Sequence, residues 1–206
     1  FSWHIYAIDP NKIVQRAQEY NKLLVKYNYE TAESIIDEWN YVEGFTDKIV
    51  SSFRAIHGLK GSAYMLSAMC LAQKCDEIDM LMYYDTRPSP FNGAFDYYTA
   101  EPLKGYYPLY WYGKFYDMEK YIAAEEDANY IYTLCGVDAN GKVLATVTYY
   151  NEANEAENKE VQLDFGKKGT YEIYLLDNEH DGELIATTDN LKFDLKIHSS
   201  ILIKEI

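Results

Sequence analysis

The sequence has little positive charge, few cysteines and no long apolar run. Nineteen Lys and Arg stand against thirty-three Asp and Glu among 206 residues, which gives a formal net charge of -14 at pH 7. Such a chain repels a phosphate backbone, so we expect no nucleic acid partner. We also expect no membrane partner, because Lys60, Gly61 and Gln73 interrupt the longest apolar candidates before they reach a membrane-helix length of roughly 18 residues.

The scarce cysteines argue against a disulfide framework. Cys70, Cys75 and Cys135 cannot all pair within the chain, and the step from Cys70 to Cys75 matches no zinc or redox spacing. We therefore expect buried thiols. No other metal-ligand spacing and no glycine-rich phosphate loop occurs, so the sequence predicts a function without metal or cofactor.

What the chain does contain is typical of a globular protein that is rich in tyrosine. Apolar residues make up 48% and charged residues 25% of the sequence, which excludes wholesale disorder. The 22 tyrosines are unusual. Tyrosine suits half-buried sheet surfaces and also offers flat amphipathic rings that can stack on sugars, so the composition suggests carbohydrate contact.

Up to Met118, short apolar runs alternate with amphipathic stretches, a pattern typical of βα units and a parallel sheet. We predict strands over 1–7, 33–39 and 78–84. The helices are predicted after Asp9, from Ser51 through at least Cys70 as one long element, and over 103–118. Three strands leave open sheet edges, so we expect the rest of the sheet either upstream of Phe1 or in a second copy of the chain.

After Glu119 the pattern changes to short strands separated by turn residues, which indicates a β-sandwich. The predicted strands span 131–137, 142–150, 160–165, 170–176, 184–188, 192–195 and 200–205. We predict a hairpin at 138–141 and another at 166–169.

The candidate functional residues follow from where parallel strands end, since the reactive groups of a barrel lie at the carboxyl ends of its strands. Those ends carry an imidazole, carboxylates, an amide and aromatic rings: His4, Tyr6, Glu38, Trp39, Asn40, Tyr84 and Asp85. Aromatic rings cover the apolar face of a pyranose and polar groups hold its hydroxyls, so this set is typical of a sugar site. In a regular strand Asp37 would face away from Glu38, as a structural residue.

One of these strands carries a specific motif. The segment Ser34-Ile35-Ile36-Asp37-Glu38-Trp39-Asn40 resembles the nucleophile strand of family 39 glycoside hydrolases, the β-xylosidase and iduronidase family, where an apolar run leads into Thr-Glu-aromatic-Asn. Glu38 takes the place of the nucleophile and Asp37 that of the Thr. In the same order, 1–6 resembles the sixth barrel strand of the family and 82–85 the eighth.

The resemblance continues to the end of the chain. Residues 103–109 resemble the segment that opens the last barrel helix, and 174–180 resemble an Asp-x-x-His signature in the carboxy-terminal sandwich. Tyr83 and Tyr84 depart from a pattern that commonly bears Trp, and the loop over 87–96 is not that of the family. These departures concern the substrate more than the reaction.

The resemblance implies an α/β fold: the last part of a (β/α)8 TIM barrel over 1–118, followed by an all-β sandwich over 119–206. It implies a retaining glycosidase that acts on oligosaccharides with Glu38 as nucleophile. The acid/base Glu of the family follows an Asn at the end of the fourth strand, and no such pair occurs in the barrel half here. We therefore expect it in a missing amino-terminal barrel half, and we expect this polypeptide by itself to be inactive.

Other interpretations stay open from the residues alone. Glu38 could be a strand-end acid paired with a Lys or Arg, and His4 a buried core histidine. The functional unit could also be the sandwich, acting as a non-catalytic carbohydrate-binding or interaction module that the barrel remnant merely supports.

Overall fold

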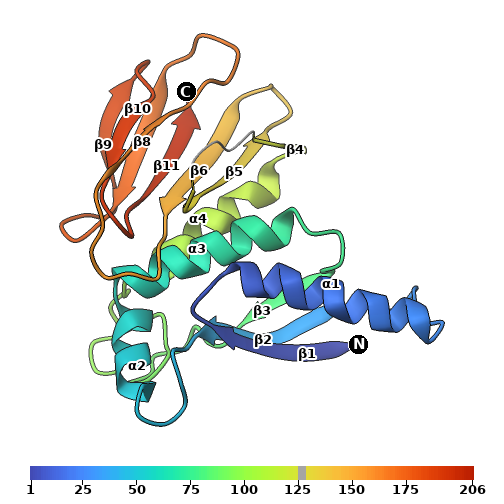
Figure 1. Cartoon of the computed structure of the whole chain (residues 1–206). Coiled ribbons are helices and arrows are strands. Elements are labelled where there is room, and N and C mark those ends of the chain that lie inside the picture. Colours follow the sequence, from blue (N-terminus) through green and yellow to red (C-terminus); the bar gives the residue numbers. More distant parts are fainter. Residues whose placement is uncertain (125–128) are drawn as a thin grey trace.

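The computed structural model describes residues 1–124 and 129–206. Its elements form three layers, with a small parallel sheet at one end, most of the helices in the middle and a larger antiparallel sheet at the other end (Figure 1). No helix of the described residues is both long and apolar enough to cross a membrane.

The parallel sheet has the order β1-β2-β3, with β1 at Ser2–Ala7, β2 at Ile35–Tyr41 and β3 at Met80–Tyr83. The strands predicted over 1–7, 33–39 and 78–84 are therefore confirmed, and each strand end lies within two residues of its predicted position. On one face, buried apolar side chains such as Ile36 pack against the helices. On the opposite face Met80 and Met82 remain 45% and 46% exposed.

The helices are α1 at Asn11–Lys26, α2 at Ile49–His57, α3 at Leu59–Gln73 and α4 at Tyr106–Gly113, which continues as the 3-10 helix η1 at Lys114–Asp117. The prediction of one long helix from Ser51 was wrong, because Gly58 adopts an extended conformation and separates α2 from α3. Gly61 then lets the start of α3 pass close to α2, since a Cβ there would lie 2.4 Å from the carbonyl oxygen of Ala55.

The remaining strands form the sandwich: β4 at Lys120–Ile122, β5 at Ile131–Val137, β6 at Val143–Tyr149, β7 at Lys159–Gln162, β8 at Tyr171–Leu176, β9 at Asp181–Thr188, β10 at Lys192–Leu195 and β11 at Ser200–Glu205. Six of them pair in the order β4-β5-β6-β11-β8-β9, and β10 pairs with β7. All seven predicted strands are confirmed, whereas β4 was not predicted.

Of the two predicted hairpins, one is correct. Asp138 closes the β5–β6 turn, where Gly141 has a φ of +75° and its N–H donates to the carbonyl of Asp138. The segment 166–169 does contain a turn, with Gly166 at a φ of +67°, but it joins strands that do not pair, since β7 pairs with β10 and β8 pairs with β9 and β11.

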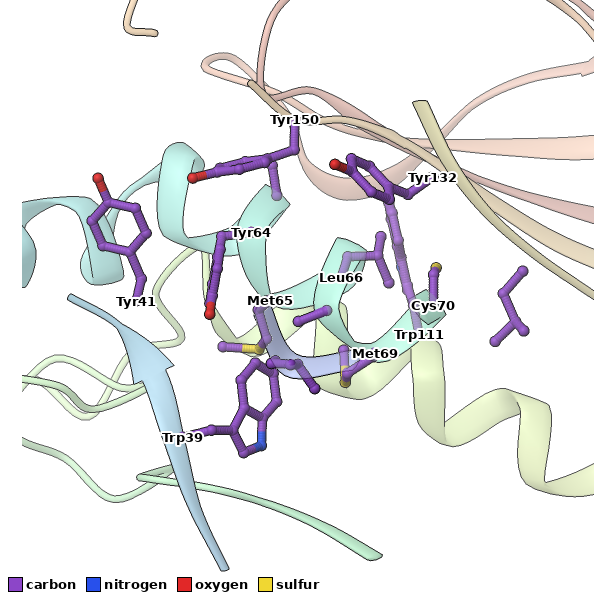
Figure 2. Packing of buried hydrophobic residues seen from close by; sticks show 14 of the residues in the cluster. Trp39, Tyr41, Tyr64, Met65, Leu66, Met69, Cys70, Trp111, Tyr132 and Tyr150 are labelled. Atoms are coloured by element: carbon purple, nitrogen blue, oxygen red, sulfur yellow. The ribbon is translucent and has the colours of Figure 1, made fainter. Parts of the chain in front are cut away.

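The helix α3 lies between the two sheets, and one apolar cluster runs across all three layers. Figure 2 shows Tyr64 and Trp111 in this cluster, with Tyr150 on the side of the sandwich and Trp39 on the side of the parallel sheet. The Tyr150 hydroxyl also donates a hydrogen bond to the carbonyl of Ile8, after β1. The sandwich thus completes the core of the βα half.

A lysine adds a polar joint between the halves. Lys104, which precedes α4, donates hydrogen bonds to the carbonyls of Asp177 and His180, at 2.6 and 3.0 Å, and pairs with Asp181 at 2.6 Å. The 177–181 turn lies between β8 and β9, so this lysine fixes one end of the sandwich to the helical layer. The Lys104 side chain is accordingly only 20% exposed.

The three cysteines agree with the sequence-based expectation. Cys70, Cys75 and Cys135 are buried and none forms a disulfide.

Candidate functional site

The site begins with an irregularity in the pairing of β1 with β2. Ser2 and Trp3 pair with Ile35 and Ile36, but His4 pairs with Glu38, so Asp37 is an extra residue in β2. Such a bulge breaks the alternation of side chains along a strand. The expectation that Asp37 faces away from the catalytic candidates was therefore wrong, because its carboxylate lies beside His4.

Beyond the bulge, Glu38 meets two side chains of β1. The Tyr6 hydroxyl donates a short hydrogen bond to Oε1, and His4 Nδ1 lies 3.9 Å from Oε2. Burial, the hydrogen bond to Glu38 and the nearby carboxylate charges raise the pKa of Tyr6 above its ordinary value of 10. Tyr6 therefore stays a neutral donor to the carboxylate throughout the physiological pH range.

His4 is held between two carboxylates. Its Nε2 lies 3.3 Å from Asp37 Oδ1, an oxygen that solvent does not reach, while Nδ1 faces Glu38. The imidazole side chain is 55% exposed, so His4 is not the buried core histidine considered as an alternative. The ring lies on the open face of the sheet, where a ligand has access to it.

Asn40 was predicted to touch substrate, but the structure buries it. Its Nδ2 donates to the carbonyl of Tyr84 at 2.6 Å, and its Oδ1 accepts from the N–H of Tyr41 and the hydroxyl of Tyr83, at 2.7 and 3.3 Å. The side-chain oxygen accepts two hydrogen bonds, and only 3% of the residue is exposed. Asn40 thus joins the end of β2 to the end of β3. It thereby fixes the backbone of Tyr84.

Tyr84 and Asp85 follow β3 and are joined by a cis peptide bond. Tyr84 is 39% exposed, which leaves its ring available to a ligand, as a sugar platform requires. Asp85 forms an ion pair with Arg87, with 2.7 Å between its Oδ2 and the arginine Nε, and its Oδ1 is buried. In this structure Asp85 therefore makes its contact within the loop, with Arg87.

Trp39 was predicted as a second platform, but in this structure its ring belongs to the buried core. Its ring is 1% exposed and packs against Tyr83 and Tyr64, with ring centroids at 5.2 and 6.4 Å. The bulge explains the outcome, because Trp39 pairs with Ile5 and points to the helices, as Ile36 does.

Phe45 is a site residue that sequence reasoning missed. It follows β2 in the loop before α2, and its ring meets that of Tyr6 edge to face, with centroids 5.3 Å apart. It is 67% exposed. The available signal was a large apolar residue between Gly44 and Thr46, in a stretch of turn residues where burial is not expected.

Together these residues place one hydrogen-bonded carboxylate among side chains that solvent can reach. A carboxylate oriented in this way can attack an electrophilic carbon or accept a proton. A cavity of about 960 Å³ lies elsewhere, in the sandwich between β5, β6 and β7. Over 1–124 and 129–206, no group of three or more His, Cys, Asp and Glu is arranged to hold a metal ion.

Comparison by sequence finds no matching protein-family profile and no matching curated protein. Comparison by structure finds many similar solved chains. A glucosidase from Croceicoccus marinus has a TM-score of 0.75 at 15% identity, over 99% of this chain and 53% of that one. An α-L-arabinofuranosidase from Thermotoga maritima has a TM-score of 0.63 at 15% identity, over 100% and 52%.

A GH30 endoxylanase from Clostridium papyrosolvens C71 also matches, with a TM-score of 0.61 at 15% identity, over 100% of this chain and 48% of that one. The chain spans about half the length of these structures. It therefore shares its fold with glycoside hydrolases, as the last part of a TIM barrel followed by a β-sandwich.

Proposed function

We propose that this chain is the carboxy-terminal portion of a retaining glycoside hydrolase, with Glu38 as the nucleophile. The observation that carries the proposal is the hydrogen bond from Tyr6 to Glu38, at the carboxyl end of a parallel strand. Barrel enzymes carry their reactive groups at that end. A neutral tyrosine donor orients one oxygen and leaves the other, Oε2, for attack.

In the first step Oε2 of Glu38 attacks the anomeric carbon of the sugar. The bond from that carbon to the leaving oxygen breaks, an ester to Glu38 forms, and a second carboxylic acid protonates the leaving oxygen. Water then attacks the same carbon with help from the second carboxylate, and the ester breaks to restore Glu38. Retaining enzymes need the two carboxyl groups roughly 5 to 5.5 Å apart.

The second carboxyl group belongs, in this proposal, to the other part of the barrel. The partner that supplies it is an amino-terminal barrel half upstream of 1–118. That half, or a second copy of the chain, would also cover the open edges of β1 and β3. Residues 119–206 act as the sandwich that completes the core. This organisation agrees with the chain spanning about half of the similar structures.

The proposed substrate is an oligosaccharide of the plant type, cleaved in the manner of a β-xylosidase of family 39. The motif around Glu38 supports this finer assignment, together with the exposed ring of Tyr84 at the end of β3.

The test uses the protein that contains this chain together with its amino-terminal half. A 2-deoxy-2-fluoro-xyloside with a good leaving group should label one residue, and peptide mass spectrometry should find the label on Glu38. Glu38→Gln should abolish both labelling and turnover, whereas Glu30→Gln, which changes an exposed glutamate ahead of β2, should retain them. Label on another carboxylate would overturn the assignment, and hydrolysis of an aryl glycoside by residues 1–206 alone would overturn the need for a second half.

A further inference from the structure

Phe45 has an exposed aromatic ring, although burial of such an apolar side chain is ordinarily favourable. Its 67% exposure is high for a large apolar side chain, yet it contacts Tyr6, the residue that holds Glu38. Exposed aromatic rings beside polar groups commonly mark ligand or partner surfaces. The question is therefore what covers this ring.

The loop that carries Phe45 is tied down just before it. The carboxylate of Glu43 accepts hydrogen bonds from Tyr41, at 2.8 Å, and from Ser51, at 3.1 Å. The N–H of Glu43 donates to Ser52 Oγ at 2.9 Å, which fixes the loop to α2. These bonds hold the pKa of Glu43 below its ordinary value, chiefly through Tyr41, so the carboxylate is charged and the anchor is intact at neutral pH.

A second feature is the chemistry around the ring. Phe45 lies past the end of β2, on the side where Tyr6 and Glu38 present a hydroxyl and a carboxylate. The exposed apolar residues of the sheet itself, Met80 and Met82, belong instead to β3. A ligand on Phe45 therefore meets an apolar ring and polar groups together, which suits a sugar, because a pyranose has a C–H face and a hydroxyl rim.

We infer that Phe45 forms a sugar-stacking subsite next to Glu38, for a pyranose unit of an oligosaccharide. This inference rests on the proposed function and deepens it. Tyr6 serves both parts of the site, since its hydroxyl holds the nucleophile and its ring supports Phe45 edge to face, a geometry that favours aromatic pairs.

The chain offers a direct reporter for this subsite. Its three natural tryptophans, Trp3, Trp39 and Trp111, are all buried, so a tryptophan at position 45 would be the exposed one and would emit at longer wavelength. The experiment titrates Phe45→Trp of the 206-residue chain with xylotetraose. We expect a shift of its emission to shorter wavelength. Tyr116→Trp is the matched control, because Tyr116 is 91% exposed in η1, and it should not respond.

Affinity gives the second readout. Phe45→Ala should weaken xylotetraose binding about tenfold, measured by backbone amide shifts, and Phe45→Tyr should restore it. A circular dichroism spectrum and melting temperature like those of the unchanged chain show that Phe45→Ala is folded, as expected for an exposed position.

The outcomes separate the subsite from the proposed function. A silent Phe45→Trp, an unchanged affinity of Phe45→Ala, or no xylotetraose binding to the chain would each overturn the subsite, whatever the label on Glu38 shows. Emission that shifts only when an amino-terminal barrel half is added, without sugar, would also overturn it, because protein then covers the ring. A responsive Phe45 with no label on Glu38 would leave a sugar-binding surface and remove the nucleophile.

Discussion

The carboxylate of Asp37 lies 3.3 Å from Nε2 of His4, while Nδ1 of the same ring faces Glu38. The contact exists because β2 carries one extra residue against β1, so that neighbouring side chains which would otherwise diverge both approach one imidazole. The histidine thereby has a carboxylate within 4 Å of each of its nitrogen atoms.

Asp37→Ala should misplace His4 and slow the proposed glycosidase reaction. Small displacements near a reacting centre cost up to about 100-fold in rate, so we expect kcat to fall about tenfold in the complete enzyme, with a smaller change in KM. Asp37→Asn keeps a side-chain oxygen near Nε2 and should recover part of the loss. Asp76→Asn, an exposed aspartate that follows Cys75, is the control. Equal kcat for Asp37→Ala and the unchanged enzyme would mean that the contact does not position His4.

Tyr6→Phe should lower kcat by about 10- to 100-fold. The hydroxyl is a neutral donor to a carboxylate, and such hydrogen bonds are worth about 1.5 to 3 kcal/mol. The phenylalanine ring keeps the contact with Phe45, so sugar binding should change little. Steady-state kinetics measure kcat, and xylotetraose titration measures sugar binding. Tyr116→Phe should change neither quantity. An unchanged kcat for Tyr6→Phe would show that the Tyr6 hydroxyl does not contribute to the reaction.

The strands could be predicted from sequence because their signal is local. In Val143–Tyr149, for example, every residue is buried, so both faces of the strand are covered. Its β-branched and aromatic residues have a high strand propensity, which predicts the strand from the sequence alone. Asp37 shows what the pattern misses, since a bulge depends on the pairing with β1 and leaves no period in β2 alone. Trp39 was misplaced for the same reason, because one extra residue turns it toward the helices.

The helical errors have a similar origin. The apolar face from Phe53 to Cys70 is continuous in sequence, yet Gly58 is extended and divides it, because α3 must turn to lie between two sheets. Likewise the turn at Gly166 has hairpin chemistry, but which strands pair is decided by the sandwich as a whole. Phe45 was missed because exposure of a loop residue is a tertiary property.

The turn that docks the sandwich should make stability depend on Asp177 at acidic pH. Burial acts to raise the pKa of Asp177, but hydrogen bonds from the N–H groups of Glu179 and His180 and from the His180 ring outweigh it and hold the pKa below its ordinary value. A depressed carboxyl pKa adds stability above the unfolded value of about 3.9, and this stability is lost as pH falls through the folded value.

Urea denaturation of Asp177→Asn tests this. We expect the variant to be less stable than the unchanged chain by about 1 kcal/mol at pH 7, and the difference to shrink as pH falls below about 4. Asp189→Asn, which changes an exposed aspartate, should cost little at either pH. If the difference in the free energy of unfolding between Asp177→Asn and the unchanged chain stays constant from pH 7 to below about 4, the charge of Asp177 is not its cause.

Gly61→Ala should separate α2 from α3 and destabilise the protein. The added Cβ would lie 2.4 Å from the carbonyl oxygen of Ala55 and 2.6 Å from Cα of Ile56, and both are backbone atoms that cannot rotate away. Because α3 carries the core shared by both sheets, we expect a loss of about 1 to 3 kcal/mol in the free energy of unfolding. Gly113→Ala is the matched control, since nothing lies within 4 Å of a Cβ there and alanine favours the helix by about 0.5 to 1 kcal/mol. If Gly61→Ala proves as stable as Gly113→Ala, the close approach of α2 and α3 is not what glycine provides at position 61.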